Sequence, residues 1–392
     1  MKNIELLFEY NRSNNIKFCK KNIKLITKGR LKFWRFKNTD RIFAGDNIYN
    51  LLCSLNYIIE IDKYHLPIML QLDTIEFNDK LVFIILECIC YYLINIAKRL
   101  VIVCFDSKNS IWTDGIYYSP LKFLKNFLSK NYNDFNVRFY KDLQLKHFRK
   151  LIRHDDLKTD YLNHVSTDIL LFLKHLSLEN STVEILCEAI IEIVGNAIEH
   201  GHSDCLIDID VTNDNYQKQN DSEELFYYGI NVVVLNFSDK EFFNKLKQKL
   251  SYSNNFDERH KKVYKAKEFH SQHFNDKYTE DDFYTIASFQ HKISGSIQKK
   301  FAGGVGLTHL VKSLEEKSSG HICYMLSKHR ALYFLKELLQ YDSDNYIGFN
   351  FENDFFGHIP ELSILKISDT YLPGTAYNLN FAIKKGDIEN GE

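Results

Sequence analysis

Residues 181–201 read STVEILCEAIIEIVGNAIEHG, and the fold expected for the second half of the chain rests on this helix-like pattern. Its apolar residues recur at helical spacing, which predicts a helix with one wide buried face. Those residues are Val183, Leu186, Ile190, Ile193, Val194 and Ala197. Polar residues recur at every fourth position of the same helix, namely Glu188, Glu192, Asn196 and His200. This spacing places them on one slowly drifting stripe, and Gly201 is expected to stop the helix.

The polar stripe has two interpretations. It is either a solvated face of a surface helix or one wall of a nucleotide site. In the second case the Asn196 oxygen would bind Mg²⁺, which prefers oxygen ligands and bridges phosphates. Glu192, one turn earlier, would orient or deprotonate a water aimed at the γ-phosphate. The spacing alone leaves both interpretations open.

Further along the chain, residues 301–314 read FAGGVGLTHLVKSL, a glycine loop that opens a helix. Gly303, Gly304 and Gly306 allow close backbone approach, and Leu307 begins a run of apolar residues at helical spacing. A glycine loop at a helix N-terminus is suited to bind an anion. The loop is not a Walker A motif, because no GKS or GKT follows it. Lys300 precedes the glycines and could reach phosphate oxygens.

Residues 192–201 (EIVGNAIEHG) resemble the N box of the GHKL ATPases, the superfamily of gyrase, MutL and histidine kinases, in the form found in anti-sigma-factor serine kinases. The glycine loop resembles the G2 box, and residues 373–381 (PGTAYNLNF) resemble the Gly-Thr that precedes the last strand of that fold. The resemblance implies ATP and Mg²⁺ as cofactors, Asn196 as the metal ligand and Glu192 as the catalytic residue. It also implies these nucleotide-binding residues: Asn196, His200, Lys300, Gly303, Gly304, Gly306, Leu307 and Thr375.

The G1 box of the family is where this sequence departs from the pattern. The family has a strand that ends in D-x-G-x-G, whose Asp reads the adenine amino group. Here Asn236 stands at the Asp position, and Ser238 and Lys240 stand at the glycines. An Asn side chain can still accept a hydrogen bond through its oxygen. Asp239 is a second candidate for reading adenine, from a shifted loop.

The first half of the chain contains a strand–helix–strand pattern at 67–73, 79–98 and 99–105, which predicts a βαβ-like unit with buried strands. The central helix is mostly apolar from Leu81 to Ala97, but Glu87 lies in its middle. Because a carboxylate at that depth of a bilayer is costly, we expect a buried helix rather than a membrane span.

The start of this helix carries a second, fainter resemblance. Residues 70–79 (LQLDTIEFND) resemble the STAS domain of anti-anti-sigma factors. STAS regulators often carry a phosphorylatable Ser there, whereas this chain has Asn78 and Asp79. The resemblance therefore implies a STAS-like fold without a phosphoacceptor.

The composition excludes several classes of protein. The chain has 392 residues, enough for about two to three domains. Fifty basic and fifty-one acidic residues give a net charge of −1, which argues against nucleic-acid or polybasic membrane-surface binding through bulk charge. The eight cysteines form no CxxC pair and predict reduced thiols of a cytosolic protein. The N-terminus lacks the pattern of a secretory signal.

We therefore expect an α/β protein with a smaller N-terminal α/β domain at 1–150 and a GHKL-type α/β sandwich (Bergerat-like) at 151–392. The apolar runs at 205–211 and 228–237 are expected to be strands of this sandwich. The segment around 240–300 is too charged to belong to the core and would form an enlarged ATP lid. The expected function is cytoplasmic signalling by an ATP- and Mg²⁺-binding switch or slow ATPase that acts on a protein partner or on its own N-terminal domain. A Ser/Thr protein kinase of the anti-sigma type and a non-enzymatic interaction module with a decayed pocket stay open as alternatives. No nucleic acid and no membrane span are expected, and a homodimer is left open.

Overall fold

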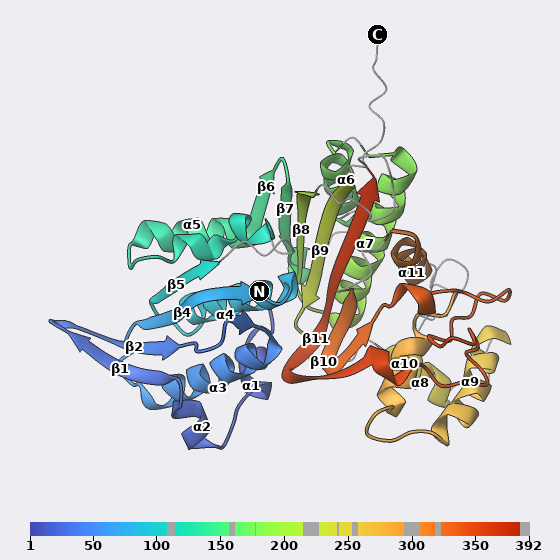
Figure 1. The fold of residues 1–392 in the computed structure, drawn as a ribbon, viewed down its shortest axis with the longest axis horizontal. Coiled ribbons are helices and arrows are strands. Elements are labelled where there is room, and N and C mark those ends of the chain that lie inside the picture. The colour runs from blue at the N-terminus through green and yellow to red at the C-terminus, as the bar shows by residue number, and fades with distance from the viewer. Residues whose placement is uncertain are drawn as a thin grey trace, which may run out of the picture.

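The chain folds into alternating layers of sheet and helix (Figure 1). The computed structural model describes residues 1–107, 114–156, 161–176, 178–214, 227–240, 243–252, 258–293, 306–317 and 323–384. A first sheet is covered by helices on one face, those helices pack against a second sheet, and a last layer of helices covers the far face of that sheet. The expected α/β class is confirmed.

The first sheet belongs to the N-terminal unit. Its strands are β1 (Ile23–Lys28), β2 (Leu31–Lys37), β3 (Ile42–Phe43), β4 (Ile68–Phe77) and β5 (Val101–Ser107). β1 and β2 form an antiparallel hairpin, whereas β2, β3 and β5 all run parallel to β4. The predicted βαβ-like unit is confirmed, since β4 and β5 are parallel and are joined through α4.

The helices of the N-terminal unit are α1 (Glu5–Tyr10), α2 (Ile16–Lys20), α3 (Gly45–Ile61), α4 (Lys80–Asn95) and α5 (Ser129–Tyr140). α3 and α4 lie between the two sheets, which explains why α4 is apolar on nearly all sides. The predicted buried helix is thus confirmed, and none of the helices in the described ranges is long and apolar enough to cross a membrane. Asp79 caps α4 by accepting from the Val82 N–H at 3.1 Å, and it also accepts from the Tyr324 hydroxyl of the second sheet at 3.0 Å.

The second sheet is antiparallel, in the order β10-β11-β9-β8-β7-β6. Its strands are β6 (Lys141–Gln144), β7 (His147–Ile152), β8 (Cys205–Asp214), β9 (Tyr227–Asn236), β10 (Tyr324–Tyr333) and β11 (Leu365–Lys384). The strands expected at 205–211 and 228–237 are confirmed as β8 and β9. Sheet membership changes at Lys141, whereas the expected domain boundary stood at residue 150.

Helices α6 (Tyr161–Lys174), α7 (Asn180–Gly201) and α11 (Gly306–Lys317) cover the outer face of the second sheet. Between β9 and α11 the chain forms α8 (Asn244–Tyr252), α9 (Glu258–Ser271) and α10 (Glu280–Ala287). The expectation that this whole segment is too charged for the core is wrong, because Phe283, Tyr284 and Ile286 are buried in the same core as α7. Short 3₁₀ helices span Asp114–Tyr118, Pro120–Phe123, His154–Asp156, Lys336–Leu338 and Leu362–Ile364.

A buried ionic network joins the two units. Lys80, at the start of α4, lies 2.7 Å from a carboxylate oxygen of Asp208 and also pairs with Asp210, both on β8. Arg149 on β7 pairs with Asp208 and reaches Glu87 of α4 at 2.6 Å. All five residues are at most 3% exposed. Glu87, which argued against a membrane span, therefore has its partner on the opposite sheet.

All eight cysteines lie in described residues and are free thiols. Seven are buried, and Cys104 is exposed. Burial raises the pKa of Cys53 to about 11 and that of Cys323 to about 12, so these thiols stay protonated.

Candidate functional site

The two central residues of the polar stripe, Glu192 and Asn196, lie at the edge of the buried face of α7. Five of the six predicted apolar residues are at most 1% exposed, and Ala197 packs against the same core. Glu192 and Asn196 are half-buried, whereas Glu188 is exposed. The Asn196 amide donates to the Glu192 carboxylate over 3.4 Å. A carboxylate and a carboxamide oxygen are therefore adjacent on one helical face, as the nucleotide interpretation requires.

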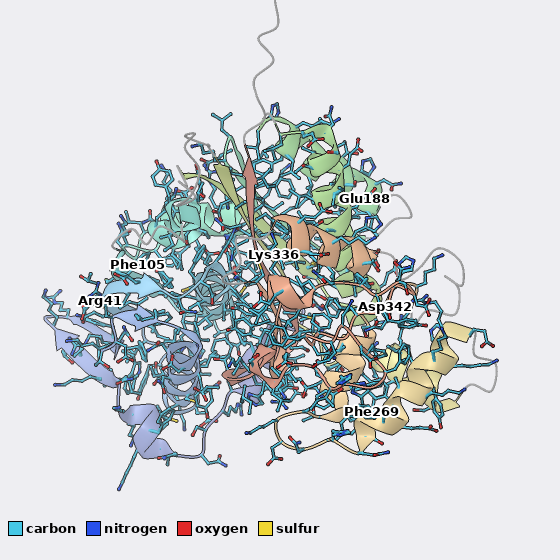
Figure 2. All side chains as sticks on the ribbon, turned by 45° about the vertical axis from the view of Figure 1, so that its right-hand side comes forward. Arg41, Phe105, Glu188, Phe269, Lys336 and Asp342 are labelled. Atoms are coloured by element: carbon cyan, nitrogen blue, oxygen red, sulfur yellow. The ribbon has the colours of Figure 1, made fainter. Side chains whose placement is uncertain are left out.

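The helix after the glycine loop packs directly against this stripe. α11 begins at Gly306, and Leu307 in its first turn is buried in the core that α7 covers. The His309 ring nitrogen lies 3.3 Å from the Glu188 carboxylate, so the N-terminal turn of α11 is adjacent to α7. Figure 2 shows α7, marked by Glu188, and α9, marked by Phe269, on the side of the molecule away from the N-terminal unit. Gly303, Gly304 and Lys300 lie outside the described residues, as does the side chain of His200.

The Asn236 loop meets the C-terminal end of α7. Asn236 is 3% exposed and donates from its amide to the Ser203 hydroxyl over 3.3 Å. Ser238, at the position of the first G1 glycine, donates to the Gly201 carbonyl at 2.8 Å. These contacts hold the end of β9 against the last turn of α7. Asp239, the second adenine candidate, is exposed just beyond them.

Gly201 has a different role from the expected one. It is the last residue of α7, and the left-handed residue that ends the helix is His202, with φ +49°. A Cβ on Gly201 would lie 2.4 Å from the Asn236 amide nitrogen. The glycine is therefore required by the close approach of the Asn236 side chain and not by its own backbone angle.

The Gly-Thr pair completes this end of the site. The Thr375 N–H donates to the Asn236 side-chain oxygen at 3.2 Å. Gly374 has φ +99°, and a Cβ there would lie 2.4 Å from the Asn236 carbonyl oxygen. The structure thus brings Asn236, Thr375 and the end of α7 together. It also shows that both groups of the Asn236 amide already have protein partners.

Tyr377 is a site residue that the sequence reasoning missed. Its hydroxyl is buried and has no hydrogen-bond partner among the described residues. Burial raises the pKa of Tyr377, and the nearby Glu192 carboxylate adds to that shift. Tyr377 stands two positions after Thr375 on β11, so strand alternation places both side chains on one face. That alternation was a readable signal in the sequence.

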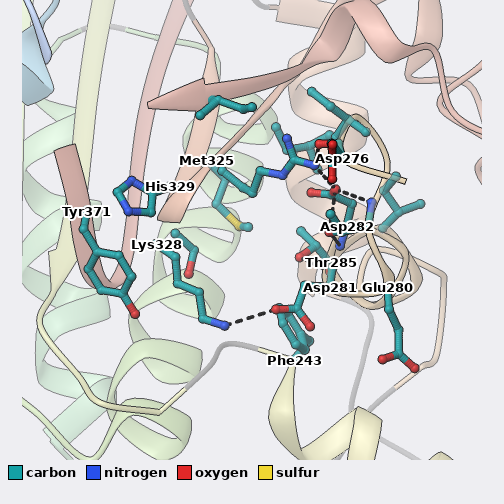
Figure 3. Close-up of a pocket in the computed structure, with 17 residues that line it drawn as sticks. Phe243, Asp276, Glu280, Asp281, Asp282, Thr285, Met325, Lys328, His329 and Tyr371 are labelled. Carbon is teal, nitrogen blue, oxygen red and sulfur yellow. Dashed lines mark hydrogen bonds and ion pairs between the residues drawn. The ribbon is translucent and has the colours of Figure 1, made fainter. Parts of the chain in front are cut away.

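A cavity of about 460 Å³ lies between α10 and the β10–β11 hairpin (Figure 3). Its apolar floor includes Met325, Leu332 and Leu365, which belong to the core under α7 and α11. Two ion pairs close its rim, Lys328 with Asp281 at 3.1 Å and Arg330 with Asp282 at 2.9 Å. The ion pairs tie the helical insertion to β10.

The same hairpin is irregular where it carries these ion pairs. Lys328 has a left-handed φ of +53°, and the register shifts between Lys328 and Arg330. On the opposite strand, residues 368–371 lie against the N-terminal unit. Thr370 donates to the Gly45 carbonyl at 2.6 Å, and the Tyr371 N–H donates to Asn11 at 2.8 Å. The irregular part of the β10–β11 pair therefore contacts α10 through β10 and the N-terminal unit through β11.

Comparison with known proteins adds no relative. No family model matches the chain. No curated protein and no solved structure matches it either. What the site can do is therefore inferred from its own residues and geometry.

Proposed function

We propose that the C-terminal unit binds ATP with Mg²⁺ on the face of α7 and acts as a nucleotide-dependent switch or slow ATPase. One observation carries this proposal. The helix that carries the Glu192–Asn196 pair is met by the first turn of α11 and by the Asn236 loop, and the Gly374–Thr375 turn holds that loop in place. The motif resemblance assigned the same four segments to one nucleotide site. Convergence of this kind is not required of an ordinary surface helix.

The donor set of the site suits the proposed ligand. The Asn196 oxygen would hold Mg²⁺, and the bound ion would neutralise charge on the phosphates. Glu192, one turn away, would orient a water toward the terminal phosphate. α11 begins at Gly306 and packs against α7, and the backbone N–H groups of a helix N-terminus stabilise an anion. The Tyr377 hydroxyl, which is buried and has no hydrogen-bond partner among the described residues, interacts electrostatically with the Glu192 carboxylate.

The output of the switch would be the N-terminal unit of the same chain. α8 touches the end of α7, because Lys245 donates to the Glu199 carbonyl at 3.3 Å. α10 is held to β10 by the Lys328 and Arg330 ion pairs, and the adjoining bulge contacts α1 and α3. A lid that moved with nucleotide would thus pull on the same hairpin that holds the N-terminal unit. A separate protein partner would read the change on that unit.

The experiment is isothermal calorimetry of ATP binding in the presence of Mg²⁺. Wild type is expected to bind, and Asn196→Ala is expected to lose at least about tenfold in affinity, since a metal ligand is removed. Asn163→Ala is the matched control, because Asn163 is an exposed asparagine on the neighbouring helix α6. Equal affinities for all three proteins would refute the assignment of the site.

The non-enzymatic alternative is favoured by one observation, namely that the Asn236 amide is occupied by Ser203 and by the Thr375 backbone. A base-reading side chain would have to give up one of these bonds. If wild type shows no binding at millimolar ATP, an interaction module with a filled base pocket replaces the switch. If ATP binds and phosphate moves to an added protein, the kinase alternative replaces it.

A further inference from the structure

The near-zero net charge of the chain hides a strong local segregation. Residues 10–39 contain ten of the fifty Lys and Arg residues and none of the fifty-one Asp and Glu residues. The rest of the chain therefore carries forty basic against fifty-one acidic side chains. The net charge of −1 is an average over these two regions. It therefore does not exclude an anionic partner for residues 10–39.

The basic segment forms a projecting ribbon. β1 pairs with β2 from Ile23 to Lys28, but β2 pairs with β4 only at its far end, from Trp34 to Lys37. The distal part of the hairpin therefore has no third strand beside it. Figure 1 shows the β1–β2 hairpin as the projection at the left edge of the molecule. Gly29 forms its tip with φ +61°.

Both faces of this ribbon carry a cation and a leucine. The cross-strand pair of Lys28 with Leu31 lies on one face. The pair of Thr27 with Lys32 lies on the other face, which also carries Leu25 because strand residues alternate. The leucines are 37% exposed at position 25 and 47% exposed at position 31.

The charges at the tip are uncompensated. Three exposed cations at the tip and one nearer the base make no ion pair with any residue in the described ranges, namely Lys28, Arg30 and Lys32 at the tip and Lys24 nearer the base. At the base of the hairpin, by contrast, Lys37 lies 3.9 Å from Asp73. Unpaired cations held together on a narrow ribbon repel one another, so an anionic surface that screens them is favoured.

We propose that the β1–β2 hairpin docks on an anionic lipid bilayer, with its cations among the headgroups and its leucines in the interfacial layer. A partner protein would cover one face of the ribbon, and nucleic acid would offer phosphates without an apolar layer. A headgroup layer surrounds an inserted ribbon on both faces and accommodates cations and leucines together. This inference goes beyond the proposed function and does not depend on nucleotide binding.

The test is co-sedimentation of the full chain with phosphatidylserine–phosphatidylcholine vesicles and with vesicles of phosphatidylcholine alone. Wild type is expected to bind only the anionic vesicles and to be released by salt. The double variant Lys28→Glu with Arg30→Glu should weaken binding to anionic vesicles by at least about tenfold, since each cation near an anionic surface contributes a similar amount of binding free energy. Leu31→Ser should also weaken binding while leaving its salt dependence unchanged.

The matched control is Lys125→Glu with Lys130→Glu, which makes the same charge change at two exposed lysines outside the hairpin. It should bind anionic vesicles as wild type does. Melting curves of each variant check that folding is intact. Three outcomes would overturn the proposal: wild type that ignores anionic vesicles at low salt, hairpin and control variants that bind equally, or hairpin-dependent binding to a labelled oligonucleotide without binding to vesicles.

Discussion

The buried ionic network makes the strongest prediction about stability, through the variant Lys80→Met. The ammonium group of Lys80 is paired with Asp208 and Asp210, and all three residues are at most 3% exposed. Methionine keeps most of the side-chain volume and removes the charge. The variant therefore leaves buried carboxylates behind without creating a large cavity.

The size of the stability loss depends on which partners each carboxylate retains in the variant. Asp208 retains Arg149, whose charge, together with that of Lys80, holds the pKa of Asp208 well below its usual range despite burial. Asp210 has no other cation among the described residues, although it still accepts from the Asn231 amide at 2.8 Å. Removing one partner of a buried ion pair typically costs about 3–5 kcal/mol. Because only one of the two carboxylates is orphaned, we expect a loss of about 3 kcal/mol.

The assay is urea unfolding followed by circular dichroism, with a second substitution to identify the cause. If an unpaired Asp210 causes the loss, Lys80→Met with Asp210→Asn should recover at least half of it, because the orphaned charge is gone. Lys262→Met is the matched control, since Lys262 is half-exposed and pairs with Asp344 at 3.3 Å on the surface. That control should change stability by no more than about 0.5 kcal/mol.

Two results would refute this reasoning. The first is a Lys80→Met protein within about 1 kcal/mol of wild type, which would mean that the pair contributes no more than a surface pair. The second is a double variant whose losses simply add, which would mean that Asp210 does not depend on Lys80.

The remaining predictions use the same unfolding assay. Gly201→Ala should lower the free energy of unfolding by about 1–3 kcal/mol through overpacking. Gly195→Ala, whose new Cβ would lie 3.7 Å from its nearest neighbour, should leave stability unchanged or raise it by up to about 1 kcal/mol. Equal effects of the two substitutions would contradict the argument that Asn236 approaches Gly201 closely. Tyr377→Phe removes a buried hydroxyl that has no hydrogen-bond partner among the described residues. The variant should leave stability unchanged or raise it by about 1 kcal/mol, and a clear loss of stability would contradict the absence of that bond. Although burial opposes it, backbone N–H groups and Arg99 hold the pKa of Asp62 below its usual value, so its stabilisation is present above about pH 4 and is lost as pH falls through the lowered pKa. Asp62→Asn should therefore be less stable than wild type at neutral pH, with a gap that narrows in acid; a constant gap would rule out the carboxylate as its source.

The elements with one strong periodicity could be predicted from the sequence. α4 and α7 have sustained helical spacing of apolar residues, β5 and β9 are compact apolar runs, and β4 and β8 alternate apolar with polar residues. The four segments of the candidate site were also readable, because glycines, Asn196 and Glu192 occur in a recognisable order. The nucleotide itself stays a prediction.

Other elements were less readable because long-range pairing defines them. β11 begins at Leu365, well before the expected start near 374, because its polar bulge at 368–371 interrupts the strand pattern while β10 still pairs across it. The projection of the N-terminal hairpin was not readable, since the absence of a third strand at its tip depends on where β4 begins.

Local sequence sets which residues of β8 share a face. The run CLIDIDV at 205–211 alternates, so Asp208 and Asp210 had to share one face of β8, and Ile207 and Ile209 the other. The burial of both faces follows from the packing of distant segments. α7 covers the isoleucines, and α4, more than a hundred residues earlier in the chain, brings Lys80 to the aspartates. Alternation is a local consequence of backbone geometry, whereas the cover over a polar face depends on a distant segment and on the charge that it carries.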